Sequence, residues 1–214
     1  MSKVTRAPRR GAQVVTDNEG TVRLAVSVDP DNRNATVVHQ HNGKRWDLLG
    51  TYHGKEGTIT PVAFAPDNEI LYILDNRETG TDSLYSFNST SEETELIYSH
   101  DVVDISGVEF APDGHLLGVY TEPDYPEFVA LNETHALAAP LAAVQNALKG
   151  YRVRPTSMTT DGNLAIIGAN SDRMPGMYFM FNVETNRLSK IVSVLPGIDA
   201  KQMRPMEPYK LTVR

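Results

Sequence analysis

The chain has no cysteine among its 214 residues. Disulfide bonds, zinc–thiolate sites and cysteine nucleophiles are therefore excluded, and the redox compartment stays open. No apolar run approaches the length that spans a membrane, and the N-terminus lacks the hydrophobic stretch of a signal peptide. We therefore expect a soluble chain with no membrane partner. As given it would be cytoplasmic, and an upstream export signal would make it periplasmic or secreted.

Positive charge is also scarce. Twenty Lys and Arg residues face 27 Asp and Glu residues, which gives a formal net charge of −7. No stripe of basic residues with interleaved aromatics occurs, so we expect no nucleic-acid partner. Hydrophobic residues make up 40% of the chain and charged residues 22%, a balance typical of a folded globular protein.

What the chain does contain is a repeat. In Ile105–Tyr120 an apolar run meets an Ala-Pro-Asp-Gly turn at Asp113 and a second apolar run follows, which indicates a β-hairpin. The same pattern surrounds Asp17, Asp67 and Asp161, and successive aspartates are 50, 46 and 48 residues apart. A period of that size, built from strands, is typical of propeller blades.

Each unit continues into further strands. Third strands are expected at Ala35–Gln40, Ser83–Asn88, Glu127–Asn132 and Met177–Asn182, and fourth strands at Arg45–Tyr52, Glu95–Ser99 and Arg187–Val194. The fold class is therefore predicted to be all-β: a β-propeller of four four-stranded antiparallel blades, forming a partial arc or a small closed ring. The blades occupy about 11–54, 55–100, 101–150 and 151–195 of a propeller region 1–195, and 196–214 is a run-out.

The third unit departs from the pattern. Its Ala- and Leu-rich stretch places Leu141, Val144 and Leu148 at helical spacing, and Gly150 provides a stop. We predict a short helix over about 140–149, with Pro140 in its first turn, where the outer strand of this blade would stand.

From this helix onward the sequence resembles the prolyl oligopeptidase family, especially its acylaminoacyl-peptidase-like bacterial members. The segments that carry the resemblance are Leu141–Gly150, Thr159–Asn163, Ser171–Phe181 and Met203–Tyr209. In that family a β-propeller precedes an α/β-hydrolase domain, covers its mouth and restricts entry to short peptides. The resemblance implies a peptide substrate or a hydrolase domain as partner, and 196–214 as the run-out toward that missing catalytic domain.

The catalytic marks of that family do not occur in these residues. Neither a Gly-x-Ser-x-Gly elbow nor a His-Gly-Gly segment is present. No catalytic residue is therefore predicted, nor any cofactor-binding or metal-binding residue, and we expect this chain to be inactive by itself. If the blades form an open arc, their apolar end faces lack partners, and self-association through those faces is expected.

Four groups of side chains were weighed as candidate sites. His39 and His41 alternate along one strand and so lie on the same face of it. They could be two ligands of a metal ion that needs a third ligand from elsewhere, or part of an exposed polar strand face. Ser171, Asp172 and Arg173 could contact a substrate terminus or a hydrolase domain, or form an ordinary loop. The loop Glu122–Glu127, which contains two prolines, three acids and a tyrosine, could make contacts or simply connect two blade strands. The turn aspartates could form a ring of carboxylates or act as turn formers. The other histidines are expected in turns and at blade edges: His53, His100, His115 and His135.

Two further functions stay open at this point. One is a free-standing propeller that acts as a binding or scaffold module, as in TolB-like periplasmic proteins. The other is a stand-alone four-bladed enzyme with a carboxylate or histidine site on the propeller face.

Overall fold

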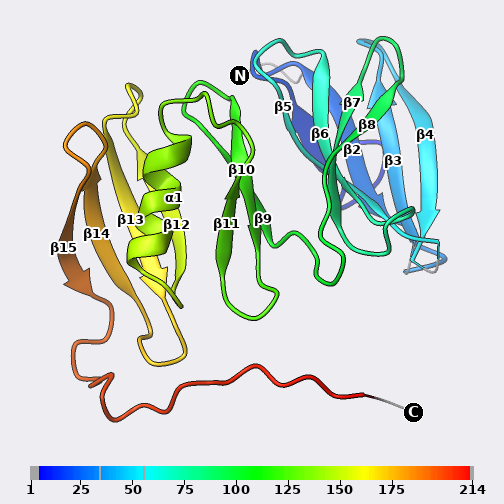
Figure 1. The fold of residues 1–214 in the computed structure, drawn as a ribbon. Coiled ribbons are helices and arrows are strands. Elements are labelled where there is room, and N and C mark those ends of the chain that lie inside the picture. The colour runs from blue at the N-terminus through cyan, green and yellow to red at the C-terminus, as the bar shows by residue number, and fades with distance from the viewer. Residues whose placement is uncertain (1–4, 34, 55, 213–214) are drawn as a thin grey trace. The chain divides into compact units, whose positions relative to one another are not determined.

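The computed structural model describes residues 5–33, 35–54 and 56–212. The chain divides into two compact units, one ending at Ile105 and the other beginning at Ser106 (Figure 1). Each unit contains two antiparallel sheets whose strands follow one another in chain order. The predicted blade boundary at position 55 lies outside the described residues.

The first unit holds two four-stranded sheets. One consists of β1 (Gln13–Thr16), β2 (Val22–Val28), β3 (Ala35–His41) and β4 (Trp46–His53), and the other of β5 (Ile59–Phe64), β6 (Ile70–Asp75), β7 (Ser83–Asn88) and β8 (Thr94–Tyr98). Side chains of both sheets share one core, formed by Leu24, Val38, Phe64, Leu71, Ile73 and Tyr85. Neither sheet could bury this apolar face alone, so packing of one sheet on the other stabilises both.

The second unit holds a three-stranded sheet, a helix and a four-stranded sheet. The elements are β9 (Gly107–Phe110), β10 (Leu116–Thr121), β11 (Glu127–Ala130), α1 (Ala138–Ala147), β12 (Arg152–Met158), β13 (Leu164–Asn170), β14 (Met177–Asn182) and β15 (Arg187–Ser193). Three of the four sheets thus have the predicted four strands. The third has three, and α1 follows β11 where the fourth strand is absent, as the Ala- and Leu-rich stretch predicts.

Helix α1 begins and ends two residues before the predicted bounds of 140 and 149. Pro140 is its third residue, which the first turn tolerates because the amides there have no intrahelical acceptor. Gly150 has a φ of 82°, so it adopts the left-handed conformation that ends a helical segment. Leu141 and Val144 are buried against the sheets of this unit.

The core of the second unit joins β10, α1 and the β12–β15 sheet. Its members are Ala111, Leu117, Leu137, Leu141, Val144, Val153, Ala165, Ile167, Ala169 and Phe181. Strand β10 is buried along its whole length, as is typical of a strand covered on both faces. Strand β13 instead alternates, with Ala165, Ile167 and Ala169 buried.

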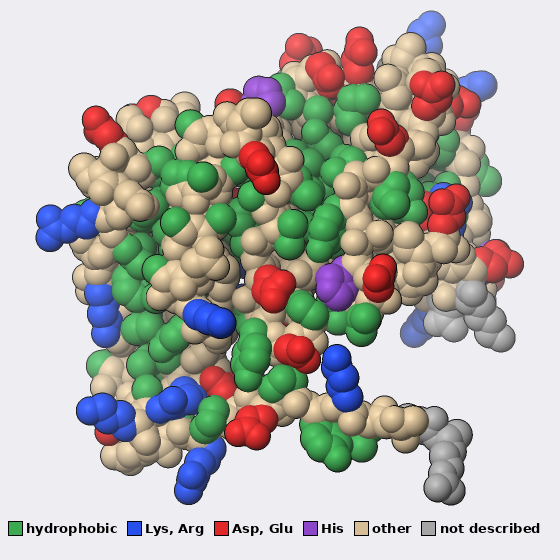
Figure 2. Space-filling model, viewed as in Figure 1, with side chains coloured by type: hydrophobic (Ala, Val, Ile, Leu, Met, Phe, Trp, Pro, Cys, Tyr) green, Lys and Arg blue, Asp and Glu red, His purple; other side chains and the backbone are tan. Residues whose placement is uncertain are grey.

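One face of the last sheet carries apolar side chains that remain exposed. On this face Tyr178 of β14 pairs with Val192 of β15, and Met180 of β14 pairs with Ile166 of β13. Figure 2 shows hydrophobic side chains along this sheet. It is the kind of blade face for which the sequence predicts self-association. Among the described residues no helix is long and apolar enough to cross a bilayer.

Gly118 lies at the centre of the buried strand β10, where there is no room for a side chain. An added Cβ would meet the carbonyl oxygen of Val129 and lie 2.7 Å from the Phe128 ring. We expect Gly118→Ala to lower the free energy of unfolding by about 1–3 kcal/mol, because backbone and ring must both move. Gly168→Ala on β13 is the matched control, since its nearest contact is the Thr156 methyl group at 3.1 Å. Equal losses in urea unfolding would contradict this account.

Candidate functional site

Two loops that the sequence singles out lie at the same end of the second unit. One joins β10 to β11 through residues 122–126, and the other joins β13 to β14 through 171–176. Residues of both loops line the same cavity, so the loops emerge at the same end of their two sheets. The C-terminal segment leaves β15 at that end too (Figure 1). The strand topology thus gathers three segments that are far apart in sequence.

Together these segments enclose an open cavity of about 520 Å³. It is lined by Glu122, Asp124, Tyr125, Pro126, Gly150, Arg152, Asn170, Ser171, Asp172, Met206, Glu207 and Pro208. The Pro-rich loop and the Ser-Asp-Arg loop, weighed separately in the sequence, therefore contribute to one site. Met206–Pro208 also line the cavity, which was not predicted. The sequence of the C-terminal segment contains no local signal for where that segment packs.

The cavity carries more negative than positive charge. Four carboxylates line it and one guanidinium, that of Arg152. Arg152 binds Glu122 in a fork, with Nε to Oε1 at 2.7 Å and Nη2 to Oε2 at 2.8 Å. The hydrogen bonds from Arg152 hold the pKa of Glu122 below its usual value. The charges of Arg152 and Glu122 cancel, so Asp124, Asp172 and Glu207 give the cavity a net negative charge.

The Ser171–Arg173 loop binds the C-terminal segment of the same chain. The Met206 amide donates a hydrogen bond to the Asp172 carboxylate. Arg173 donates from Nε and Nη2 to the Ala200 carbonyl oxygen, at 3.1 and 2.9 Å. Both charged side chains of the loop are therefore engaged within the chain, so a contact to a substrate terminus or to another domain would have to share or replace these bonds.

The turn aspartates act as turn formers. Each accepts hydrogen bonds from backbone amides of its own hairpin: Asp17 from Glu19 and Thr21, Asp67 from Glu69 and Ile70, Asp113 from His115, and Asp161 from Asn163. This is the chemistry that makes aspartate frequent in turns. The hydrogen bonds favour the turn interpretation over a ring of carboxylates.

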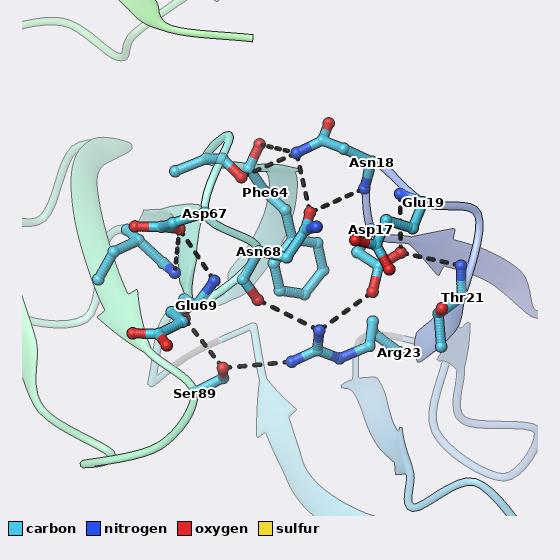
Figure 3. A network of polar contacts seen from close by, with 12 residues as sticks. Asp17, Asn18, Glu19, Thr21, Arg23, Phe64, Asp67, Asn68, Glu69 and Ser89 are labelled. Carbon is cyan, nitrogen blue, oxygen red and sulfur yellow. Dashed lines mark hydrogen bonds and ion pairs between the residues drawn. The ribbon is translucent and has the colours of Figure 1, made fainter.

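Asp17 has a second role, shown in Figure 3. Its carboxylate pairs with Arg23 at 3.1 Å, and Arg23 also donates to the Asn68 carbonyl oxygen at 3.2 Å and to Ser89 Oγ at 3.2 Å. Burial raises the pKa of Asp17, but the bonds from Thr21, Arg23 and Glu19 outweigh it, and the net pKa is lowered. The network links the two sheets of the first unit, which is a structural role.

The histidines predicted on a strand and those predicted in turns differ in their surroundings. His39 and His41 on β3 are half-buried, so the expectation of an exposed strand face is wrong for them. Burial, followed by the charge of Arg9, lowers the pKa of His39. Among the described residues one group of three potential metal ligands lies close together, and it contains neither of these histidines but Asp113, His115 and His135.

A polar cluster around the buried side chain of Tyr120 in the second unit, with Glu109 and Arg154 half-buried, was not predicted. Tyr120 donates a hydrogen bond to Glu109 Oε2 at 3.1 Å, and the Arg154 guanidinium lies 4.3 Å from the centre of the Tyr120 ring. Burial raises the pKa of Glu109 to about 7, against the opposing effects of Tyr120 and Arg154. Burial likewise raises the pKa of Tyr120. The sequence gives no local sign of this cluster, because its members lie on three different strands.

The chain was compared with protein-family models, curated proteins and solved structures. No protein-family model matches the chain. In sequence it is similar to dipeptidyl aminopeptidase BIII of Pseudoxanthomonas mexicana, with 22% identity over 205 residues that cover 95% of this chain and 29% of that protein. The chain therefore spans less than a third of the length of this curated relative.

Solved structures with a similar fold include peptidases and a TolB protein. A puromycin-hydrolyzing peptidase of Mycobacterium tuberculosis has a TM-score of 0.56 at 12% identity, over 92% of this chain and 31% of that one. Prolyl oligopeptidase B of Galerina marginata has 0.55 at 11% identity, over 89% and 28%. TolB of Acinetobacter baumannii has 0.50 at 8% identity, over 86% and 44%. The predicted fold is confirmed: the chain consists of β-propeller blades, and it resembles the propeller segments of prolyl oligopeptidase-type peptidases.

Proposed function

We propose that this chain is the non-catalytic propeller portion of a prolyl-oligopeptidase-family serine peptidase, in which it gates the access of short peptides to a hydrolase domain. The observation that carries the proposal is the alignment of 95% of the chain with 29% of a dipeptidyl aminopeptidase. The gate would be steric: it excludes large substrates and water from the reacting bond and performs no chemistry itself.

The cavity at the loop end of the second unit is the part of the chain best suited to contact a peptide. Pro123 and Pro126 restrict the backbone of its Glu122–Glu127 loop, so little conformational entropy is lost when a ligand orders it. Tyr125 in this loop is 48% exposed and offers both an aromatic face and a hydroxyl group. The negative balance of the lining favours cationic over anionic peptides.

The proposal predicts that the purified chain does not hydrolyse peptide p-nitroanilides or p-nitrophenyl esters. Release of the chromophore is measured with substrate equimolar to the chain and with substrate in excess. Each measurement is repeated in the presence of a serine-directed phosphonate inhibitor. Turnover that the phosphonate blocks would show a catalytic serine in this chain and contradict the proposal. The coding sequence after codon 214 provides the second test, because a gate requires a hydrolase domain with a Gly-x-Ser-x-Gly segment to follow.

Gating itself is tested in the longer protein that the proposal implies. There Tyr125→Ala should raise the cleavage of long polypeptides relative to dipeptide and tripeptide substrates, since it widens the entry. Tyr178→Ala is the matched control, because Tyr178 is 38% exposed but projects from the face of β14 and does not line the cavity. An unchanged preference for substrate length in Tyr125→Ala would argue against this cavity as the gate.

A second function, that of a TolB-like binding or scaffold module, is favoured by the similarity to TolB over 86% of the chain. It requires no hydrolase segment. A defined protein partner captured by the purified chain, together with a coding sequence that lacks the hydrolase elbow, would support this function in place of the first.

A further inference from the structure

Three side chains that can ligate a metal meet on the second unit, at the end of the sheets opposite the cavity. Asp113 and His115 belong to the turn between β9 and β10, and His135 belongs to the segment between β11 and α1. Their ligand atoms all lie within 4.8 Å of one another. This group is independent of the gating function proposed above, because it lies at the other end of the strands.

The spacing of the ligand atoms fits a small divalent ion. Asp113 Oδ2 lies 3.1 Å from His115 Nδ1 and 3.5 Å from His135 Nε2. In a tetrahedral zinc site with bonds of about 2.1 Å, two ligand atoms are about 3.4 Å apart. Two of the three separations therefore match the site as it stands, and small side-chain rotations bring the two ring nitrogens together.

The turn holds the carboxylate in position. Asp113 Oδ1 accepts the His115 amide at 3.1 Å, which leaves Oδ2 directed at the two imidazoles. Gly114 has a φ of 86°, the conformation that this turn requires.

The segment that carries His135 is fixed to the core. The His135 side chain is 19% exposed, and Leu137 and Ala138, which follow it, are buried. The Leu137 amide donates to His135 Nδ1 at 3.2 Å. In this arrangement the ring proton lies on Nε2, between the imidazole and Asp113. A metal at Nε2 requires the proton to move to Nδ1, so that the bond from Leu137 is lost and the affinity is reduced.

We propose that Asp113, His115 and His135 form a binding site for one divalent transition-metal ion of the zinc class. Two imidazoles and one carboxylate are the donors that Zn²⁺ accepts readily, whereas Mg²⁺ and Ca²⁺ prefer oxygen ligands alone. Three protein ligands leave at least one coordination position for water or for an external group. Because the bond from the Leu137 amide competes, binding is expected at micromolar Zn²⁺.

The test titrates chelator-treated chain with Zn²⁺ by isothermal calorimetry, at low micromolar protein. We expect one ion per chain, with affinity at least about tenfold lower in His135→Ala and in Asp113→Asn. Asn at 113 retains an oxygen for the turn, so this variant separates the loss of a ligand from the loss of the hairpin. His100→Ala is the control, because His100 accepts the amides of Val102 and Val103 in a turn of the first unit.

A second readout identifies the ligands directly. Histidine ring nitrogens are followed by NMR while Zn²⁺ is added, and those of His115 and His135 should shift together while His100 stays unchanged. Magnesium at the same concentration should shift none of them. The proposal is overturned if Zn²⁺ does not saturate the chain, or if His135→Ala and Asp113→Asn, folded by circular dichroism, bind it as the parent chain does.

Discussion

Phe181→Ala is expected to lower the free energy of unfolding by about 3–5 kcal/mol, the largest loss of stability predicted for a single substitution in this chain. Phe181 is 1% exposed and lies in the core of the second unit with Leu117 and Ile167. Removing its ring takes away apolar surface buried between the β9–β11 and β12–β15 sheets, and the strands around it relax only partly into the space.

The neighbouring residue is the matched control. Met180 is 45% exposed on the opposite face of β14, so Met180→Ala should change the free energy of unfolding by no more than about 0.5 kcal/mol. Both variants are compared with the parent chain in urea, with circular dichroism as the probe. A loss of under about 1 kcal/mol for Phe181→Ala would mean that the two sheets do not share the core described here.

The strands could be predicted from the sequence because their signals are local. An aspartate-marked turn between apolar runs fixes a hairpin within about 15 residues, since the turn geometry and the side-chain alternation both act at short range. The helix was predicted for the same reason: the spacing of Leu141 and Val144 and the stop at Gly150 lie within one short segment. Both arrangements of the four blades, a partial arc and a small closed ring, stay predictions.

The sites could not be predicted in this way, because they depend on the register and stacking of whole sheets. Asp113 and His135 are 22 residues apart and meet only because the segment after β11 returns to the β9–β10 turn. Each was read as a turn residue in isolation. The cavity likewise needs the C-terminal segment to fold back to Asp172, and no motif in Met203–Tyr209 shows that contact. The partial burial of His39 and His41 follows from packing, which the alternation of one strand does not reveal.

The cluster of Glu109, Tyr120 and Arg154 gives the second large expectation, which concerns pH. Burial raises the pKa of Glu109 from 4.5 to about 7. A carboxyl group with a raised pKa binds its proton more tightly in the folded state than in the unfolded state. Its contribution to stability is therefore complete below pH 4.5 and is lost as the pH rises to about 7. The loss is on the order of 3 kcal/mol, since each pKa unit between 4.5 and about 7 corresponds to about 1.4 kcal/mol.

Glu109→Gln removes this dependence, because glutamine stays neutral and its oxygen can still accept the bond from Tyr120. At pH 8 the variant should therefore be more stable than the parent chain by on the order of 3 kcal/mol, and at pH 4 the two should be about equal. Glu127→Gln on β11 is the control, since it makes the same substitution at an exposed position. Urea unfolding of the three chains from pH 4 to pH 8 measures the difference. If Glu109→Gln destabilises the chain at pH 8, then Arg154 and Tyr120 stabilise the ionised carboxylate of Glu109 by more than burial destabilises it, the opposite of the balance described here.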